Sequence, residues 1–139
     1  MMDLRKSILV VDDSSIMRRL VREIVESDPD FHVIDTAENG KVALQKVRLH
    51  KPDCILLDIE MPELDGLATL EPLRRQAPRV PVIMFSSLTE LGAAATLEAL
   101  SRGASDFFTK PTGIGGADAS RNVVRKELVP AIRAISGRP

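Results

Sequence analysis

The stretch "DCILLDIEMPELDG", residues 53–66, runs four apolar residues into an acidic residue and then into a turn. Its apolar run, Cys54 to Leu57, has the unbroken hydrophobicity of a parallel strand that helices cover on both faces. Asp58 closes this strand, and burying a carboxylate there is costly unless the charge has a partner. The stretch therefore predicts an α/β fold in which the Asp58 carboxylate interacts with a group outside the strand.

The composition is that of one globular domain, since 44% of the 139 residues are hydrophobic and 28% are charged. Lys and Arg number 19 and Asp and Glu number 20, so no excess charge attracts the chain to nucleic acid or an anionic membrane. Trp and Tyr are absent, which leaves bases little to stack on. No apolar run approaches the roughly 20 residues that span a bilayer, and the first residues do not resemble a signal peptide. We therefore expect a cytoplasmic protein with no nucleic-acid partner and no membrane insertion.

Short aliphatic or β-branched runs alternate with longer segments of helical period, which is the pattern of a parallel sheet with crossover helices. The predicted strands are 7–13, 31–37, 53–58, 80–87 and 104–111. The predicted helices are 14–28, 39–50, 64–77, 89–103 and 118–136. In the first helix Ile16, Leu20 and Ile24 share one face, which we expect to pack on the sheet. Pro130 removes a hydrogen bond from the last helix and is expected to kink or interrupt it.

Five strand–helix units in this order predict a flavodoxin-like three-layer sandwich in one domain, residues 1–139, with a five-stranded parallel sheet of order 2-1-3-4-5 and five helices. In such sheets ligands bind beyond the carboxyl ends of the strands, where the strand order reverses. The polar residues that end the strands are Asp12 and Asp13 on the first, Asp58 on the third, Ser86 on the fourth and Lys110 on the fifth. We expect these side chains to meet at one rim of the sheet.

Three carboxylates at one rim repel one another, and a small hard cation between them relieves the repulsion. Mg²⁺ suits such a site, because it takes oxygen ligands and is usually held by one or two carboxylates with phosphate oxygens. An Asp can also act as a nucleophile that forms an aspartyl phosphate. The candidate metal ligands are Asp12, Asp13 and Asp58, with Lys110 as the fixed cation and Ser86 as the hydroxyl donor. Taken alone, "DDS" after a strand favours a helix N-cap over a metal site, and only the other rim residues change that preference.

Four segments of the chain, "ILVVDDSSIMRRL", "ILLDIEMPELDG", "MFSS" and "GASDFFTKP", resemble the receiver domain of two-component response regulators over about residues 5–135. The resemblance implies the CheY-like form of the fold and a last helix that continues past Pro130. It also implies that Asp58 accepts a phosphoryl group from a histidine kinase. Mg²⁺ would then be held by Asp12, Asp13, Asp58 and the backbone carbonyl of Glu60.

The same resemblance assigns a switch beside the phosphoacceptor. Ser86 stands at the family's Thr/Ser switch position, and Phe107 stands where the family places an aromatic ring that reorients on activation. Core packing is the alternative interpretation of Phe107. Lys110 stands at the position of the family's phosphoryl-binding lysine, and the bond between Lys110 and Pro111 is a candidate cis peptide that would aim the lysine across the rim.

A longer segment, "VIMFSSLTELGAAATLEALSRGASDFFTKP" at 82–111, resembles the receiver half of chemotaxis protein-glutamate methylesterases. In that family an esterase domain follows the receiver, which restrains it until phosphorylated. The resemblance implies a chemotaxis-type kinase as donor and an output surface on the fourth helix, fifth strand and fifth helix. This chain has only His32 and His50 as histidines and no room for a hydrolase domain, so no esterase site of its own is expected.

Two other interpretations stay open. The chain is either an excised methylesterase regulatory domain or a stand-alone receiver that acts as a protein-binding adaptor or phosphate sink. An independent enzyme on the same fold is disfavoured, because an Asp-nucleophile phosphatase needs a second Asp where Glu60 stands, and a flavin site needs aromatic rings that this chain lacks.

Overall fold

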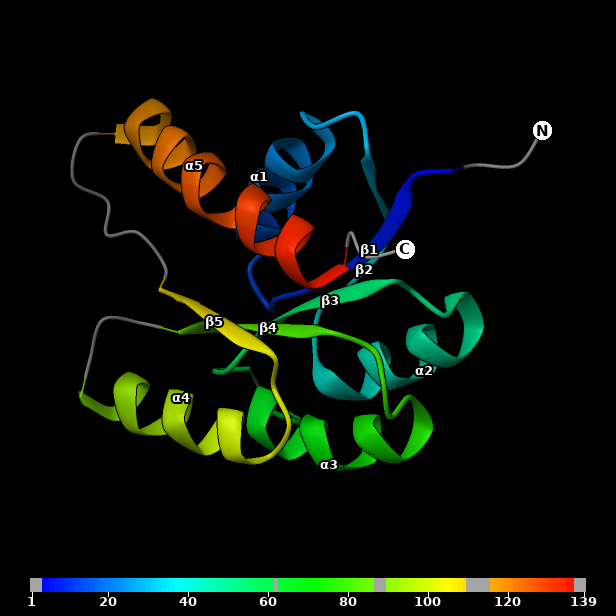
Figure 1. Cartoon of the computed structure of the whole chain (residues 1–139). Coiled ribbons are helices and arrows are strands. Elements are labelled where there is room, and N and C mark those ends of the chain that lie inside the picture. The colour runs from blue at the N-terminus through cyan, green and yellow to red at the C-terminus, as the bar shows by residue number, and fades with distance from the viewer. Residues whose placement is uncertain (1–3, 62, 87–89, 110–115, 137–139) are drawn as a thin grey trace.

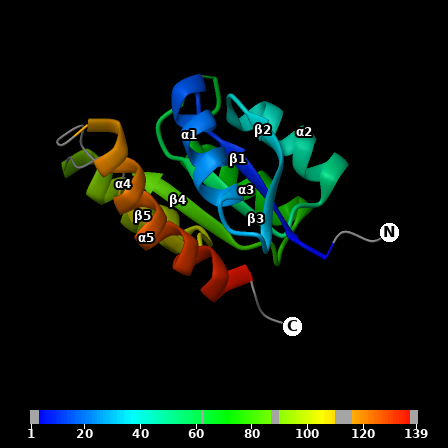
Figure 2. The same cartoon turned by 90° about the horizontal axis from the view of Figure 1, so that it is seen from above.

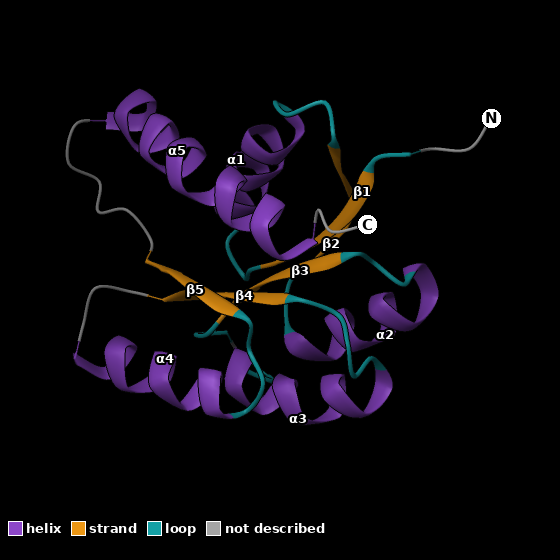
Figure 3. Ribbon diagram, in the orientation of Figure 1, coloured by secondary structure: helices purple, strands orange, loops and turns teal. Residues whose placement is uncertain are grey.

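The computed structural model describes residues 4–61, 63–86, 90–109 and 116–136. In this part of the chain a five-stranded parallel sheet lies between two layers of helices (Figure 1). The strands are β1 (Lys6–Val11), β2 (Phe31–Ala37), β3 (Cys54–Asp58), β4 (Val82–Ser86) and β5 (Asp106–Thr109). The helices are α1 (Ser15–Glu26), α2 (Gly40–His50), α3 (Gly66–Gln76), α4 (Glu90–Ser101) and α5 (Gly116–Ser136). Helices α1 and α5 cover one face of the sheet, and α2, α3 and α4 cover the other (Figure 3).

The strand order is β2-β1-β3-β4-β5, which confirms the predicted flavodoxin-like, CheY-like sandwich. Helices α1 and α5 pack side by side, as the two perpendicular views show (Figures 1 and 2). Strands β4 and β5 each begin two residues later than the predicted ranges of 80–87 and 104–111, at Val82 and Asp106. Among the described residues their pairing runs from Ile83 with Asp106 to Ser86 with Thr109.

The core consists of two apolar layers, one on each face of the sheet. Alternate residues of the central strands divide between them, so Val10 packs towards α1 and α5 and Val11 towards α2 and α3. The Phe85 and Phe108 rings pack together in the first layer, with their centroids 5.2 Å apart. All of β3 is buried, as its unbroken run predicted. Burial raises the pKa of the Cys54 thiol to about 12, so this side chain is an inert part of the core.

A one-residue bulge separates the two halves of β2. Val33 pairs with Ile8 of β1, but the next residue of β1, Leu9, pairs with Asp35. Ile34 is therefore an extra residue, and it reverses the face to which the odd-numbered residues of β2 point. Those before the bulge pack towards α1 and α5, whereas those after it point towards α2. The bulge thereby delivers the Asp35 carboxylate to α2.

Asp35 fastens the end of β2 to α2. Its carboxylate accepts hydrogen bonds from Lys46 Nζ at 3.0 Å and from its neighbour's backbone, Thr36 N–H, at 2.7 Å. His50 Nε2 lies 3.0 Å from the other carboxylate oxygen. Burial alone would raise the pKa of Asp35, but the hydrogen bonds from Lys46, Thr36 and His50 outweigh it and lower that pKa below its ordinary value. The charged form of Asp35 is therefore stabilised by folding.

We expect Asp35 to make the free energy of unfolding of the domain depend on pH in the acid range. A carboxyl group with a lowered pKa stabilises the fold above its unfolded pKa of about 3.9, and the contribution disappears as the pH falls through the folded pKa. Asp35→Asn should cost on the order of 1 kcal/mol at neutral pH and flatten the fall in stability below about pH 4. Urea unfolding at a series of pH values measures this. Glu38→Gln, at an exposed acid, is the control and should keep the pH profile of the unaltered protein. If Asp35→Asn keeps that profile as well, Asp35 does not stabilise the fold through its charge.

The structure corrects the predicted apolar face of α1 and shows that α5 is continuous through its proline. Ile24 is buried and Leu20 partly buried, but Ile16 is 81% exposed, because it lies in the first turn of α1, beside the open rim of the sheet. The predicted apolar face is therefore wrong at Ile16. Helix α5 continues through Pro130, as the family resemblance implied, and Pro130 itself is exposed.

No helix in the described ranges combines the length and the hydrophobicity needed to cross a membrane.

Candidate functional site

The carboxyl ends of β1 and β3 bring three acidic side chains together. Val11 and Leu57 are partners in the β1–β3 ladder, so the residues that follow them, Asp12 and Asp58, end neighbouring strands. Oxygen atoms of Asp12, Asp13 and Asp58 all lie within 4.8 Å of one another. Asp12 and Asp58 are each 3% exposed, while Asp13 is exposed. β1 is flanked by β2 and β3, so this is the predicted point at which the strand order reverses.

The turn from β1 into α1 fixes the Asp12 carboxylate. Asp12 N–H donates to the Ala37 carbonyl at 3.0 Å, and Asp12 Oδ1 accepts from Ser14 N–H at 2.9 Å. Ser14 in turn caps α1, with its Oγ accepting from Met17 N–H at 3.2 Å. The "DDS" sequence therefore combines both interpretations, because Ser14 supplies the N-cap and the two preceding carboxylates belong to the acidic cluster.

The loop after β3 is held against Asp58 by a glycine that sequence reasoning did not single out. Gly66 N–H donates to the Ile59 carbonyl at 2.8 Å, and a Cβ on Gly66 would lie 2.3 Å from the Asp58 carbonyl oxygen. Any side chain there would displace the backbone of the acidic residue. The "DG" pair at 65–66 is the only sequence signal, and it reads equally as a helix start, since Asp65 caps α3.

A second glycine fixes the other side of the same loop. Gly40, at the start of α2, donates its N–H to the Leu64 carbonyl at 3.0 Å. A Cβ on Gly40 would lie 2.0 Å from Thr69 Oγ1, and Thr69 itself is 1% exposed. This close approach of α2 to α3 leaves the loop little freedom beside the acidic cluster.

Ser86 and Phe107 occupy different environments on neighbouring strands. Ser86, the last residue of β4, is 5% exposed, and β4 pairs with β3 such that Phe85 stands opposite Asp58. Phe107 on β5 is 46% exposed, whereas Phe108 is buried against Phe85. Core packing is therefore the wrong interpretation for Phe107, because Phe108 has the core position.

The remaining predicted site residues are only partly described. Lys110 and Pro111, with their candidate cis peptide bond, lie outside the described residues. Glu60 is exposed two residues after Asp58, and its N–H donates to Asp58 Oδ1 at 3.3 Å. That bond turns the chain so that Glu60 stays beside the acidic cluster.

The donor set fits a hard divalent cation. It offers three carboxylates in one small volume, two of them buried, and no sulfur or imidazole ligand among the clustered groups. Oxygen-only ligands of this kind suit Mg²⁺ and disfavour softer metals. Burying two like charges side by side is costly, and a cation between them reverses the sign of that interaction.

Comparison with known proteins relates this fold and site to others. Residues 8–120 match the family model of the response regulator receiver domain. A protein-glutamate methylesterase/protein-glutamine glutaminase from a Nocardioides species is 48% identical over 131 residues, which are 94% of this chain and 36% of that protein. One from Trichodesmium erythraeum is 44% identical, over 94% of this chain and 37% of its own length. This chain thus spans about a third of the curated relatives it matches.

Solved structures agree with the sequence relatives. The crystal structure of the response regulator domain of Thermotoga maritima CheB has a TM-score of 0.84 and 44% identity, covering 97% of this chain and 98% of that one. A chain from the CheX–CheY complex of Borrelia burgdorferi with BeF3 and Mg²⁺ has a TM-score of 0.74 and 30% identity, covering 91% and 89%. The present chain belongs to the response regulator receiver domain family and is similar to the receiver domain of CheB.

Proposed function

We propose that Asp58 is the phosphoacceptor and takes its phosphoryl group from a histidine kinase of the chemotaxis type. The observation that carries the proposal is the cluster of Asp12, Asp13 and Asp58, with Asp58 buried at the end of the central strand. Receiver domains accept phosphate from histidine kinases, and the family match extends across all three residues.

The chemistry assigns a role to each group at the rim. A carboxylate oxygen of Asp58 attacks phosphorus, and an O–P bond forms as the bond to the donor's imidazole nitrogen breaks. Asp12, Asp13, Asp58 and the carbonyl of Glu60 would hold Mg²⁺, which when bound neutralises charge on the phosphoryl oxygens. Lys110 and the Ser86 hydroxyl would bind those oxygens. The hydrogen bonds made by Asp12 and by the Gly66 N–H keep the acidic cluster in place before the phosphodonor binds.

The test is phosphorylation in solution. Incubation with acetyl phosphate and Mg²⁺, or with an autophosphorylated chemotaxis-type kinase, should add one phosphoryl group to the intact protein. The product should be labile to hydroxylamine, as an acyl phosphate is, and its formation should stop when EDTA removes the metal. If no donor of either kind gives a phosphoprotein, or the label resists hydroxylamine, the proposal is wrong.

We further propose that phosphorylation controls a protein-glutamate methylesterase output. This assignment is supported by the relatives at 48% and 44% identity, which carry that name and of which the matched residues make up 36% and 37%. The alternative is a stand-alone receiver that acts as an adaptor or phosphate sink. The length of the native reading frame separates the two. With a hydrolase domain present, methylesterase turnover of the full-length protein should rise on phosphorylation, and an output indifferent to phosphorylation would contradict control.

The surface through which output would pass carries large exposed apolar side chains on two of its elements. Leu97 and Leu100 of α4 and Phe107 of β5 are 70%, 37% and 46% exposed. Large apolar side chains left exposed on consecutive elements are consistent with a protein contact. They lie on the predicted output surface of α4, β5 and α5, which a methylesterase domain or another protein would cover.

A phosphoryl group on Asp58 would act on this surface through Ser86 and Phe107. It adds about −1.5 to −2 charge and three acceptor oxygens. The buried Ser86 hydroxyl can donate to one oxygen by moving towards it, which vacates space that the Phe107 ring can enter. Complete burial of Phe is worth roughly 1.5–3 kcal/mol. The ring is already about half covered, so its further burial contributes on the order of 1 kcal/mol, and the phosphoryl contact must supply the rest.

Removing the Ser86 hydroxyl should therefore uncouple the two ends of the switch. With beryllofluoride and Mg²⁺ as the phosphoryl mimic, we expect amide chemical shifts to change at the Asp58 rim and also around Phe107 and α4. In Ser86→Ala the rim changes should remain and the distant set should shrink several-fold. A Ser101→Ala control removes a hydroxyl from the far end of α4 and should preserve both sets. Shifts confined to the rim in the unaltered protein would show that this route does not operate.

A further inference from the structure

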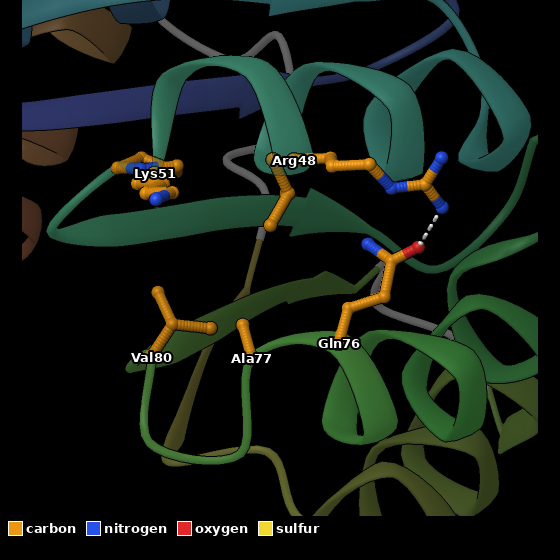
Figure 4. A pocket seen from close by; sticks show the side chains of 7 residues that line it. Arg48, Lys51, Gln76, Ala77 and Val80 are labelled. Atoms are coloured by element: carbon orange, nitrogen blue, oxygen red, sulfur yellow. Dashed lines mark hydrogen bonds between the residues drawn. The ribbon is translucent and has the colours of Figure 1, made fainter.

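A cavity of about 450 Å³ opens at the end of the molecule opposite Asp58, where α2 and α3 both end. Figure 4 shows it between Arg48 and Lys51 of the α2 end and Gln76, Ala77 and Val80 of the α3 end. Its volume falls in the range of roughly 300–1,000 Å³ that is usual for small-molecule sites. None of the described residues assigned to phosphoryl transfer lines it.

The walls of this cavity are apolar. Val47 is 4% exposed and Pro52 is buried, and both come from the end of α2 and the approach to β3. Ala77 and Val80, each partly exposed, form the facing wall in the turn between α3 and β4. An apolar group placed between these walls would be removed from water on two sides.

Hydrogen bonds fix the positions of the two walls relative to each other. Gln76 bridges the helices, with its Oε1 accepting from Arg48 Nη2 at 2.8 Å and its Nε2 donating to the Leu44 carbonyl at 3.2 Å. The wall formed by Ala77 and Val80 is fixed by Arg74, whose Nη1 donates to the Val80 carbonyl at 2.6 Å. The cavity is therefore preformed, and a ligand would not have to order its walls.

The charge around the cavity is positive and incompletely paired. Arg48 commits one Nη2 hydrogen to Gln76 and keeps further donors of its guanidinium. Lys51 lines the cavity, and within the described ranges its ammonium makes no ion pair or hydrogen bond. No carboxylate is among the residues of the described part of the chain that line the cavity. The nearest acid in sequence, Asp53, is occupied by the N–H and hydroxyl of Ser7.

Lys51 also has an unusual backbone. It caps α2 in the left-handed conformation, with φ 48° and ψ 61°, where glycine is the residue of lowest conformational cost. A cation at the C-terminus of a helix is favourable in itself, but Arg48 already provides a positive charge in the last turn of α2. The helix dipole explains why a positive residue stands at the end of α2. It does not explain the apolar cavity beside Lys51.

We propose that this cavity is a binding site for a small amphipathic anion. The apolar body of the ligand, an aromatic ring or short aliphatic chain, lies between the Val47 and Val80 walls. Its carboxylate pairs with the Lys51 ammonium and the unused N–H groups of Arg48. The proposal is independent of phosphorylation, since the site and Asp58 lie at opposite ends of the sheet.

The test uses 4-phenylbutyrate as the probe and the neutral alcohol 4-phenylbutan-1-ol as its matched control. For a compound of this size we expect saturable binding with a Kd on the order of 1 mM. Amide chemical shifts should move at 47–52 and 76–80 and stay unchanged at the Asp58 rim. The alcohol should bind several-fold more weakly, because it keeps the apolar body and lacks the charge.

Variants separate this site from general adsorption. Lys51→Gln should weaken the carboxylate about threefold to tenfold and leave the affinity of the alcohol unchanged. Arg79→Gln, which removes a cation from the neighbouring turn outside this cavity, should leave both unchanged. The proposal is overturned if no saturable binding appears by about 10 mM, if the shifts fall elsewhere, or if Lys51→Gln and Arg79→Gln weaken the carboxylate equally.

Discussion

Replacing Asp58 with Asn is expected to abolish phosphorylation of the protein completely. Asn has nearly the same shape, so it fits the buried end of β3, but its amide is not a nucleophile towards phosphorus. Intact-protein mass spectrometry after incubation with acetyl phosphate and Mg²⁺ measures the result. The variant should show no phosphoprotein at a time when the unaltered chain is substantially modified.

The fold of this variant should survive. Removing one of three clustered carboxylates relieves repulsion, so the melting temperature without Mg²⁺ should stay equal or rise. Asp53→Asn is the matched control, because it makes the same change just before the opposite end of β3. This control should be phosphorylated like the parent protein. Label that persists on Asp58→Asn would place the nucleophile elsewhere.

Mg²⁺ is expected to stabilise the folded domain through the acidic cluster. At ten times its Kd, a ligand that binds only the folded state contributes about 1.4 kcal/mol. For a domain of this size that corresponds to a rise of about 4–6 °C in melting temperature. Asp13→Ala should remove most of this rise, because Asp13 is the exposed member of the cluster and its loss leaves the backbone contacts of Asp12 intact.

Thermal unfolding with and without Mg²⁺ makes the comparison. Glu38→Ala is the control, since Glu38 is an exposed acid just after β2 and is not one of the clustered carboxylates. It should keep the full response to the metal. Equal responses in the two variants would remove Asp13 from the metal site.

The fold was predictable because the strands carry strong local signals. The apolar run before Asp58 is buried along its whole length, and parallel strands must then deliver their terminal residues to one edge. The meeting of Asp12, Asp13 and Asp58 at that edge follows once β1 and β3 are neighbours, as the predicted strand order places them. Right-handed crossover connections leave few alternative strand orders for such a sheet.

Other features depend on contacts that no local pattern encodes. The bulge at Ile34 is invisible in a run that reads as one continuous strand, yet it decides that Asp35 faces α2. Ile16 has the helical spacing of a core residue and is exposed because the sheet ends before it. Gly66 matters through a carbonyl eight residues earlier in the chain, a distance that only the folded loop reveals.

The most direct test of the account is chemical identification of the phosphorylated residue. Borohydride reduces an acyl phosphate to an alcohol, which converts a phosphorylated Asp to homoserine and leaves free carboxylates unchanged. After phosphorylation, reduction and proteolysis, peptide sequencing by mass spectrometry should find homoserine at residue 58 and at no other Asp. Homoserine at position 12 or 13 with an unmodified Asp58, or phosphate on a His or Ser that borohydride does not reduce, would contradict the central claim.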